Sequence, residues 1–214
     1  MKRHSDRDGV FQLKIVLNDS TPRVWRRILV PHNYTFFDLH VAIQNALGWM
    51  DSHLHAFHIA QKGTAIPLSI EFPNPEEDDL SWPGEQEKLD ERKEKIADYL
   101  GTRVKQCIYD YDFGDGWTHS ILFERELPAD RTLQYPQCVA GENACPPEDC
   151  GGVGGYDYLQ KVLKNPHHKE HKNMLEWLDI ENPEEFNPGE FNCRDVEFEN
   201  PAVCLAEWER RFGL

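Results

Sequence analysis

The chain has 214 residues, of which 39% are hydrophobic, enough for one large domain with a packed core. It contains neither a run of eighteen apolar residues nor an apolar stretch behind its N-terminal MKRHSDRDG, so we expect no membrane span, no secretory signal and a cytoplasmic location. The formal net charge of -15 opposes general binding of phosphate backbones. In a reducing compartment the six cysteines are expected as core residues, ligands or reactive groups rather than as disulfides.

The first part of the chain predicts strands around one helix. Residues 11–17 alternate apolar and polar side chains, which is the period of a half-buried strand. Residues 24–30 predict a second strand. Thr35 is suited to cap a helix that Gly48 ends. The further strands expected here cover residues 53–59 and 66–70.

The middle of the chain predicts a hairpin behind a polar excursion. Residues 71–94 are rich in Pro, Glu and Asp, a composition typical of a surface segment, and a short helix is expected around residues 89–100. Asp115-Gly116 suits a type I′ turn between strands at residues 104–113 and 117–126. A two-residue turn would place Asp112 opposite His119, whereas a longer loop would change this register.

The last part of the chain predicts helices joined by irregular segments. Prolines and glycines between Tyr135 and Tyr156 predict a loop rather than a helix or strand. The apolar residues Tyr156, Leu159 and Leu163 recur at helical spacing behind it. Two further helices are expected to begin at Asn165-Pro166, reaching about Leu178, and at Asn200-Pro201.

Because strands come first and helices later, the expected fold class is α+β. We expect a mixed or antiparallel sheet, an early helix after the second strand, and a helical C-terminal part. The expected organisation is a disordered tail at residues 1–10, a domain at residues 11–186 and a C-terminal extension at residues 187–214, whose terminal helix packs on the domain.

Five strings of the sequence, taken in order, resemble one known family. They are TPRVWRRILVP, TFFDLHVAIQNALGWMDSHLHAF, YDYDFGDGWTH, YPQCVAGENACPPEDCGG and HKEHKNMLEWL. Together they span roughly residues 11–178 and resemble the Ri-plasmid open-reading-frame-three-like family, also labelled insertion-element passenger or TnpR-like proteins. The resemblance implies an α+β domain found in bacteria and archaea, sometimes beside mobile elements or fused to small metal-binding modules. It implies no particular reaction.

The first candidate site is a zinc centre in the cysteine-containing loop. Cys138, Cys145 and Cys150 follow a C-x6-C-x4-C spacing, and zinc takes four nitrogen or sulfur donors. A fourth ligand could come from a histidine on a strand or helix. The candidate histidines are His53, His55, His168 and His171. The alternative interpretation is that the cysteines are buried apolar side chains and the helical histidines are solvated.

The second candidate site is a group of acids and imidazoles around the hairpin. Asp110, Asp112 and His119, with His53 or His55 on a neighbouring strand, could hold a cation that activates water, or act as acid and base. The alternative is an ordinary cross-strand pair between Asp112 and His119. Aromatic residues near these turns are more often core than a ligand pocket.

The function predicted from the residues and the resemblance is that of an accessory or interaction protein associated with plasmids and mobile elements. A structural zinc in the cysteine-containing loop is an optional part of this prediction. One alternative is a metal-dependent hydrolase-like enzyme that uses the Asp/His cluster. Another is a nucleic-acid-associated protein, for which Arg23, Arg26 and Arg27 are the local basic residues. A protein partner is compatible with this prediction, nucleic acid is disfavoured by net charge, and no membrane is expected.

Overall fold

The computed structural model describes residues 9–74 and 88–214 and contains one eight-stranded sheet in the order β5-β4-β3-β6-β7-β1-β2-β8. Neighbouring strands are antiparallel except β4 and β5, which are parallel. The expected α+β class with a mixed sheet is therefore confirmed. The strands are β1 Gly9–Leu17, β2 Trp25–Pro31, β3 His55–Ile59, β4 Leu68–Glu71, β5 Lys88–Asp90, β6 Gln106–Tyr111, β7 Trp117–Pro128 and β8 Gln137–Glu142.

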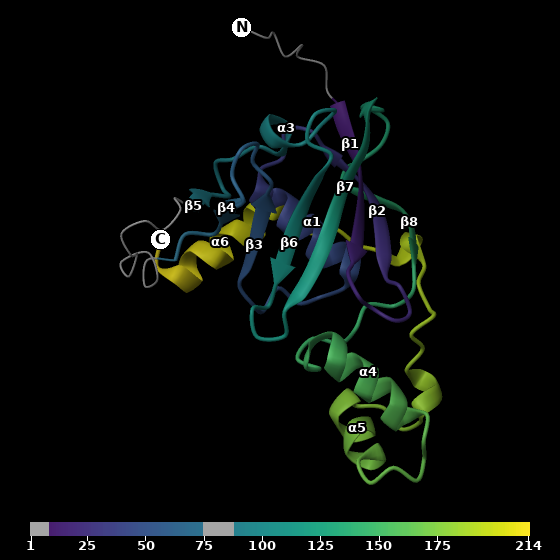
Figure 1. The fold of residues 1–214 in the computed structure, drawn as a ribbon. Helices are drawn as coiled ribbons and strands as arrows, with labels where there is room; N and C mark the ends of the chain where they lie inside the picture. The colour runs from purple at the N-terminus through teal and green to yellow at the C-terminus, as the bar shows by residue number, and fades with distance from the viewer. Residues whose placement is uncertain (1–8, 75–87) are drawn as a thin grey trace, which may run out of the picture.

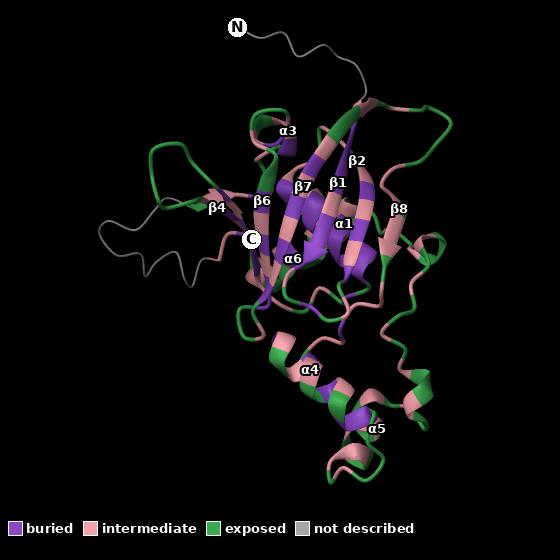
Figure 2. Ribbon diagram, turned by 45° about the vertical axis from the view of Figure 1, so that its right-hand side comes forward, coloured by how far each residue is buried: buried purple, intermediate pink, exposed green. Residues whose placement is uncertain are grey.

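Helices cover one face of the sheet and form a small lobe below it (Figure 1). The helices are α1 Phe36–Leu47, α3 Ile96–Tyr99, α4 Gly152–Leu163, α5 His171–Leu178 and α6 Pro201–Phe212, with short 3₁₀ turns at Pro183–Glu185 and Cys193–Asp195. Figure 2 shows that buried residues concentrate where α1 lies against the sheet. No helix in the described parts of the chain has the length and apolar character that crossing a bilayer requires.

The early helix α1 forms where its capping residues predict. The Thr35 side chain accepts a hydrogen bond from the Asp38 N–H, and the Asp38 carboxylate accepts one from the Thr35 N–H. Gly48 ends the helix with φ 83°, a left-handed conformation that favours glycine. The inner side of α1 packs on the main core, and Phe37 and Val41 on its other side contact α6 residue Trp208 in a second cluster.

The hairpin of β6 and β7 has a longer loop than a two-residue turn. Tyr111 pairs with Trp117, so the loop contains five residues, and His119 pairs with Tyr109 instead of Asp112. The Asp112 carbonyl accepts a hydrogen bond from the Gly116 N–H at 2.6 Å. Its side chain caps two further N–H groups of the loop. These bonds stabilise the longer loop, so the expected Asp112–His119 pairing is wrong.

The segment expected to be a loop from Tyr135 to Tyr156 contains regular structure at both ends. Its first part is β8, which pairs with the edge of β2 and carries Cys138 opposite Ile28. A Cβ at Gly141 would lie 2.4 Å from the ring of Phe191, so glycine permits this close packing. The irregular part, which we call the cysteine loop, is confined to residues 143–151. Residues 137–142 form a strand because they pair with the edge strand β2, although the prolines and glycines near them favour turns.

Three other expected boundaries differ from the structure. Residues 166–170 form turns and α5 begins at His171, so His168 and His171 do not share a helix face. Residues 75–87 of the expected polar excursion lie outside the described residues, but the chain beyond them forms β5 and buries Glu91. Of the expected tail, residues 1–8 are outside the described part, whereas Gly9 and Val10 begin β1.

Candidate functional site

Two groups of histidines and carboxylates lie at the end of the sheet where the loop between α1 and β3 meets the β6–β7 hairpin. In the described ranges 9–74 and 88–214, these are the groups in which three potential metal-ligand atoms lie within 4.8 Å of one another. We call His53, Asp112 and Asp149 the open cluster, and His40, Asp51 and His55 the buried cluster.

The open cluster brings together residues from three separate segments. His53 Nε2 lies 3.1 Å from Asp149 Oδ1 and 3.6 Å from Asp112 Oδ2. Although both oxygens are near, this nitrogen has no hydrogen-bond partner within the described structure. Separations of this size between donor atoms match ligands that share one ion at about 2.0–2.2 Å. The separations in the open cluster therefore meet the distance requirement for three ligands of one ion.

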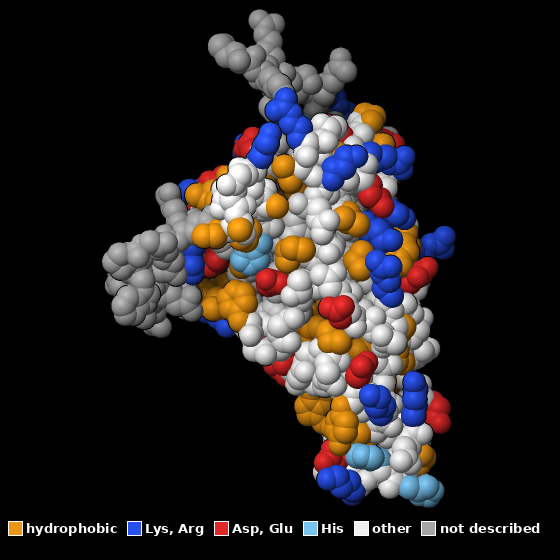
Figure 3. All heavy atoms as spheres, viewed as in Figure 1, with side chains coloured by type: hydrophobic (Ala, Val, Ile, Leu, Met, Phe, Trp, Pro, Cys, Tyr) orange, Lys and Arg blue, Asp and Glu red, His pale blue; other side chains and the backbone are white. Residues whose placement is uncertain are grey.

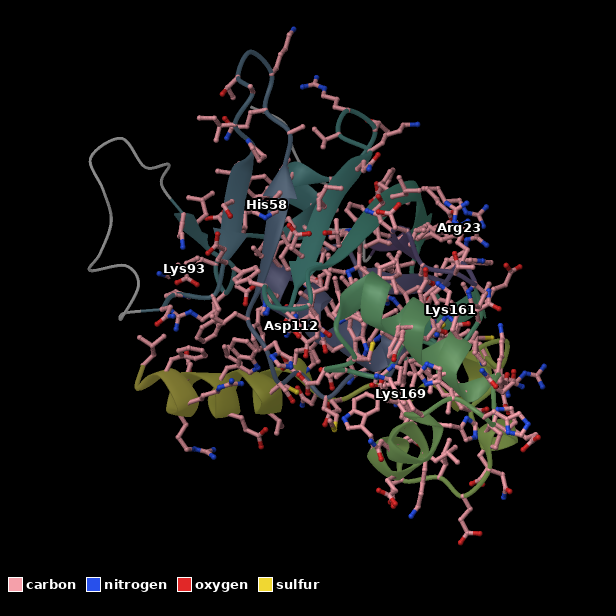
Figure 4. The ribbon with its side chains drawn as sticks, turned by 60° about the horizontal axis from the view of Figure 1, so that its bottom comes forward. Arg23, His58, Lys93, Asp112, Lys161 and Lys169 are labelled. Carbon is pink, nitrogen blue, oxygen red and sulfur yellow. The ribbon has the colours of Figure 1, made fainter. Side chains whose placement is uncertain are left out.

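Asp112 is held in place by its own hairpin loop (Figure 4). Its Oδ1 accepts hydrogen bonds from the N–H groups of Gly114 at 2.9 Å and Asp115 at 3.2 Å. Its backbone has φ 54°, which aspartate tolerates better than most residues. With Oδ1 occupied by the loop, Oδ2 remains directed at His53.

The cysteine loop is anchored so that Asp149 faces His53. Glu148 accepts hydrogen bonds from the Met50 N–H at 2.8 Å and from the Tyr111 hydroxyl. Burial raises the pKa of Tyr111, which keeps this hydroxyl protonated as the donor. The indole of Trp49 donates to the Pro146 carbonyl at 2.9 Å. These contacts fix the part of the cysteine loop that directly precedes Asp149.

The open cluster is accessible to solvent. The Asp149 side chain is 65% exposed, and that of His53 is 29% exposed. Two large apolar side chains of the same loops, Met50 and Phe113, are also exposed. The Asp149 carboxylate is therefore open to solvent, whereas His53 Nε2 is covered and Asp112 is buried.

The buried cluster is part of a hydrogen-bond network in which, among the described residues, His55 Nδ1 and Gln44 Oε1 lack a partner. His40 and His55 stack with ring centroids 3.4 Å apart and planes within 4°. His40 Nε2 lies 2.8 Å from Asp51 Oδ1, and His55 Nε2 lies 2.8 Å from Glu91 Oε2. Burial lowers the pKa of His40, which favours the neutral ring. Because an imidazole lone pair lies in the ring plane, parallel rings at this spacing cannot both direct a lone pair at one ion.

The network of the buried cluster continues into α1, β6 and α6. Gln44 donates to the Tyr109 hydroxyl at 2.9 Å, and this hydroxyl lies 2.8 Å from His40 Nδ1. Trp208 donates to Asp51 Oδ2 at 2.6 Å. Since Tyr109 and His40 are fully buried, we interpret this network as a structural one that positions the loop carrying His53.

The three residues expected to act together at the hairpin do not meet. Asp110 lies on the opposite sheet face from His119, and its Oδ2 is 3.3 Å from His58 Nε2. Hydrogen bonding to His58 lowers the pKa of Asp110. His119 is fully buried, donates from Nδ1 to the Tyr109 carbonyl at 3.2 Å, and has its pKa lowered by burial to about 4. Asp112 and Asp110 thus lie next to different histidines: Asp112 next to His53, which was an expected partner, and Asp110 next to His58, which was not.

The expected zinc ligands are distributed over two regions. Cys138 lies on β8, and Cys145 and Cys150 lie in the cysteine loop; none of them belongs to either cluster. Burial raises the pKa of Cys138 to about 11 and that of Cys150 to about 12, which keeps both thiols protonated at neutral pH in the absence of a metal. A zinc centre built on these cysteines stays a prediction.

The expected histidine ligands are also separated. His53 and His55 lie in different clusters. His171 Nδ1 donates to the Val162 carbonyl at 3.0 Å and ties α5 to α4. His168 Nδ1 accepts from the Glu170 N–H at 3.2 Å. Both lobe histidines therefore have local structural roles.

The three arginines in and just before β2 do not form one basic surface. Arg26 is 1% exposed and donates to the Ala46 carbonyl at the end of α1 and to the Glu142 carbonyl of β8. Arg27 forms a two-pronged ion pair with Glu124, whereas Arg23 is exposed. Arg26 therefore supports the helix end and cannot contact a nucleic acid in this fold.

Sequence reasoning missed the acidic residues that complete the two clusters. Asp51 stands in the string Asp51-Ser-His53-Leu-His55, where acid and imidazole alternate, and Asp149 directly precedes Cys150. The nearness of Asp51 to His53 and His55, and of Asp149 to Cys150, could have marked these acids as candidate ligands. Glu91 follows a charge-rich segment, and no local pattern separates it from the solvated acids near it.

Comparison with known proteins places the fold and sequence in a family. The family model described as plasmid pRiA4b ORF-3-like protein matches residues 9–195. The uncharacterized protein y4hQ of Sinorhizobium fredii is 36% identical over 169 residues, covering 79% of this chain and 80% of that protein. The crystal structure of a protein of unknown function, MM3350 from Methanosarcina mazei Go1, matches with a TM-score of 0.77 and 38% identity over 90% of this chain and 99% of that chain. The chain belongs to the plasmid pRiA4b ORF-3-like family.

Proposed function

We propose that the open cluster binds one divalent metal ion and that the protein is a metal-dependent hydrolase-like enzyme. The observation that carries this proposal is the unbonded His53 Nε2, which lies 3.1 Å and 3.6 Å from two carboxylate oxygens. A buried nitrogen with no hydrogen bond beside two acceptors is costly for a neutral imidazole. An ion shared by all three residues removes that cost.

The ligand set suits catalysis better than structural zinc binding. One imidazole nitrogen and two carboxylate oxygens leave at least one coordination position for water, as in catalytic sites with three protein ligands. A bound ion would lower the pKa of that water and supply a nucleophile. Asp149 is exposed, so a substrate can approach the ion from its side, and Phe113 offers an apolar contact next to it.

Metal binding is tested by calorimetric titration with Zn²⁺, Mn²⁺ and Mg²⁺ separately. We expect one ion per chain and at least about tenfold weaker binding for Asp112→Asn. Asparagine keeps an oxygen for the two loop N–H groups and tolerates the positive φ, so the variant should fold normally. Asp110→Asn removes the same charge from a residue that lies beside His58, outside the open cluster, and serves as the control. Equal affinity of the Asp112→Asn variant and wild type would refute the site.

Hydrolysis is tested on the metal-loaded protein with chromogenic phosphate monoesters, phosphate diesters and carboxyl esters. We expect turnover of one class that needs the added metal and is lost in Asp112→Asn. Metal binding without turnover of any class would leave a binding protein and reject the enzyme.

An accessory role with a structural zinc is the second candidate, and the position of Cys145 and Cys150 in one loop favours it. Metal analysis of Cys145→Ser and Asp112→Asn separates the two ideas, because each variant removes a ligand from only one proposed centre. Loss of zinc only in Cys145→Ser supports the structural centre and contradicts the open cluster.

A further inference from the structure

A cavity lies at the opposite end of the sheet from the open cluster. It has a volume of about 870 Å³ and is bordered by the start of β1, the end of β7 and residues 99–105. On β7, Trp117 lies at the end near the open cluster and Arg125 lines the cavity. Eight residues of strand at about 3.3 Å each separate these two residues by about 25 Å. We call this the basic cavity. Its size is that of a site for a small organic molecule.

The floor of the basic cavity is apolar and aromatic. Phe11 and Phe123 are nearly buried and meet edge to face with ring centroids 4.9 Å apart. Leu100, Val104 and the ring of Tyr99 extend the same surface. An aromatic body placed here would bury apolar area against rings that are already fixed by the core.

The rim of the basic cavity carries cations without acidic partners. Its basic residues are Lys95, Arg103, Lys105 and Arg125. Within the described residues, none of these four has a carboxylate within 4.0 Å; Arg125 instead donates to the neutral Gln12 Oε1 at 2.9 Å. Figure 3 shows Lys and Arg side chains gathered near this end of the sheet.

The acidic residues of the cavity do not cancel this charge. The lining has three, Asp98, Glu124 and Glu126. Glu124 is neutralised by Arg27, with bonds of 2.6 and 2.7 Å, and Glu126 lies 3.6 Å from His32. Four cations against three acids give a positive lining on a chain with net charge -15. A positively charged cavity on a negatively charged chain favours an anionic ligand.

We propose that the basic cavity binds a phosphorylated aromatic molecule of the mononucleotide class. Four cations that have no carboxylate partner among the described residues match a ligand with several negative charges, which a single carboxylate does not supply. The aromatic floor matches a planar base, and arginines recognise phosphate oxygens in pairs. The site is independent of the metal proposed at the open cluster.

The test is a titration with ATP, ADP and AMP in the presence of EDTA, followed by calorimetry. We expect saturable binding that weakens as salt is raised, and pyrophosphate and adenosine should each bind more weakly than ATP. The double variant Arg103→Ala/Lys105→Ala should bind at least about tenfold more weakly. The control Lys169→Ala/Lys172→Ala removes two exposed lysines from the lobe of α4 and α5 and should match wild type.

Several outcomes would overturn this assignment. They are no saturable binding of any mononucleotide, equal affinity in the Arg103→Ala/Lys105→Ala variant with an unchanged melting temperature, and tighter binding of a fatty acid or a single-stranded oligonucleotide than of ATP. Asp112→Asn should bind nucleotide like wild type. The basic cavity and the open cluster can therefore fail separately.

Discussion

Trp208 donates a hydrogen bond of 2.6 Å to Asp51 Oδ2, while Asp51 Oδ1 lies 2.8 Å from His40. This contact joins α6 to the loop between α1 and β3. The indole also packs edge-on against His55 with a centroid distance of 5.2 Å. The C-terminal helix thus holds the loop from which His53 reaches the open cluster.

Replacing Trp208 by Phe should destabilise the protein while keeping most of the packing. Loss of a hydrogen bond to a charged, partly buried carboxylate costs about 1.5–3 kcal/mol. Chemical denaturation should show this decrease in the free energy of unfolding. The exposed Trp177 provides the control, since Trp177→Phe should change stability by less than about 0.5 kcal/mol. Equal effects of the two changes would contradict the role given to the indole.

Two glycines of α4 should respond oppositely to alanine. A Cβ at Gly155 would lie 1.8 Å from the Cys150 carbonyl oxygen, so Gly155→Ala must displace the cysteine loop and lower the melting temperature. A Cβ at Gly154 would have no atom within 4 Å, so Gly154→Ala should stabilise the helix by up to about 1 kcal/mol. Each variant adds one methyl group, so a comparison of their thermal unfolding tests the close approach of Gly155 to the Cys150 carbonyl. Similar melting temperatures would count against it.

His119 should make stability depend on pH. Burial lowers its pKa from 6.5 to about 4 in the folded protein. Between these values the unfolded chain binds a proton that the folded chain does not, so stability decreases as pH falls from about 6.5 to about 4 and then levels off. The full contribution is about 3 kcal/mol. In His119→Asn, which retains a donor for the Tyr109 carbonyl, denaturation at several pH values should show a smaller decrease over this range.

The fully buried pair of His55 and Glu91 should distinguish charge from hydrogen bonding. Glu91→Gln keeps an oxygen that accepts from His55 Nε2 and should cost little. Glu91→Ala leaves that nitrogen buried without a partner and should cost about 3–5 kcal/mol, as removal of one member of a buried pair does. Urea denaturation compares the two. A glutamine variant as unstable as the alanine variant would show that the charge, rather than the hydrogen bond, is required.

The regular elements that were predicted correctly depend on near neighbours in the chain. Alternation in β1 and the capping of α1 between Thr35 and Gly48 are decided within a few residues, so they were visible before any tertiary contact was known. The β8 strand was missed because its signal is a partner, the free edge of β2, rather than its own composition.

The α+β class, the early helix, the hairpin and the family could be predicted from the amino-acid sequence, because each rests on local periodicity or on strings of adjacent residues. Which functional groups meet depends on contacts between segments that are distant in the chain. Asp112 lies beside His53 rather than His119, because its carboxylate caps a five-residue loop. Asp149 lies beside the same histidine, because the preceding Glu148 accepts hydrogen bonds from Met50 and Tyr111. Strand order and loop anchoring set such distances, and neither is encoded in the spacing of residues along the chain.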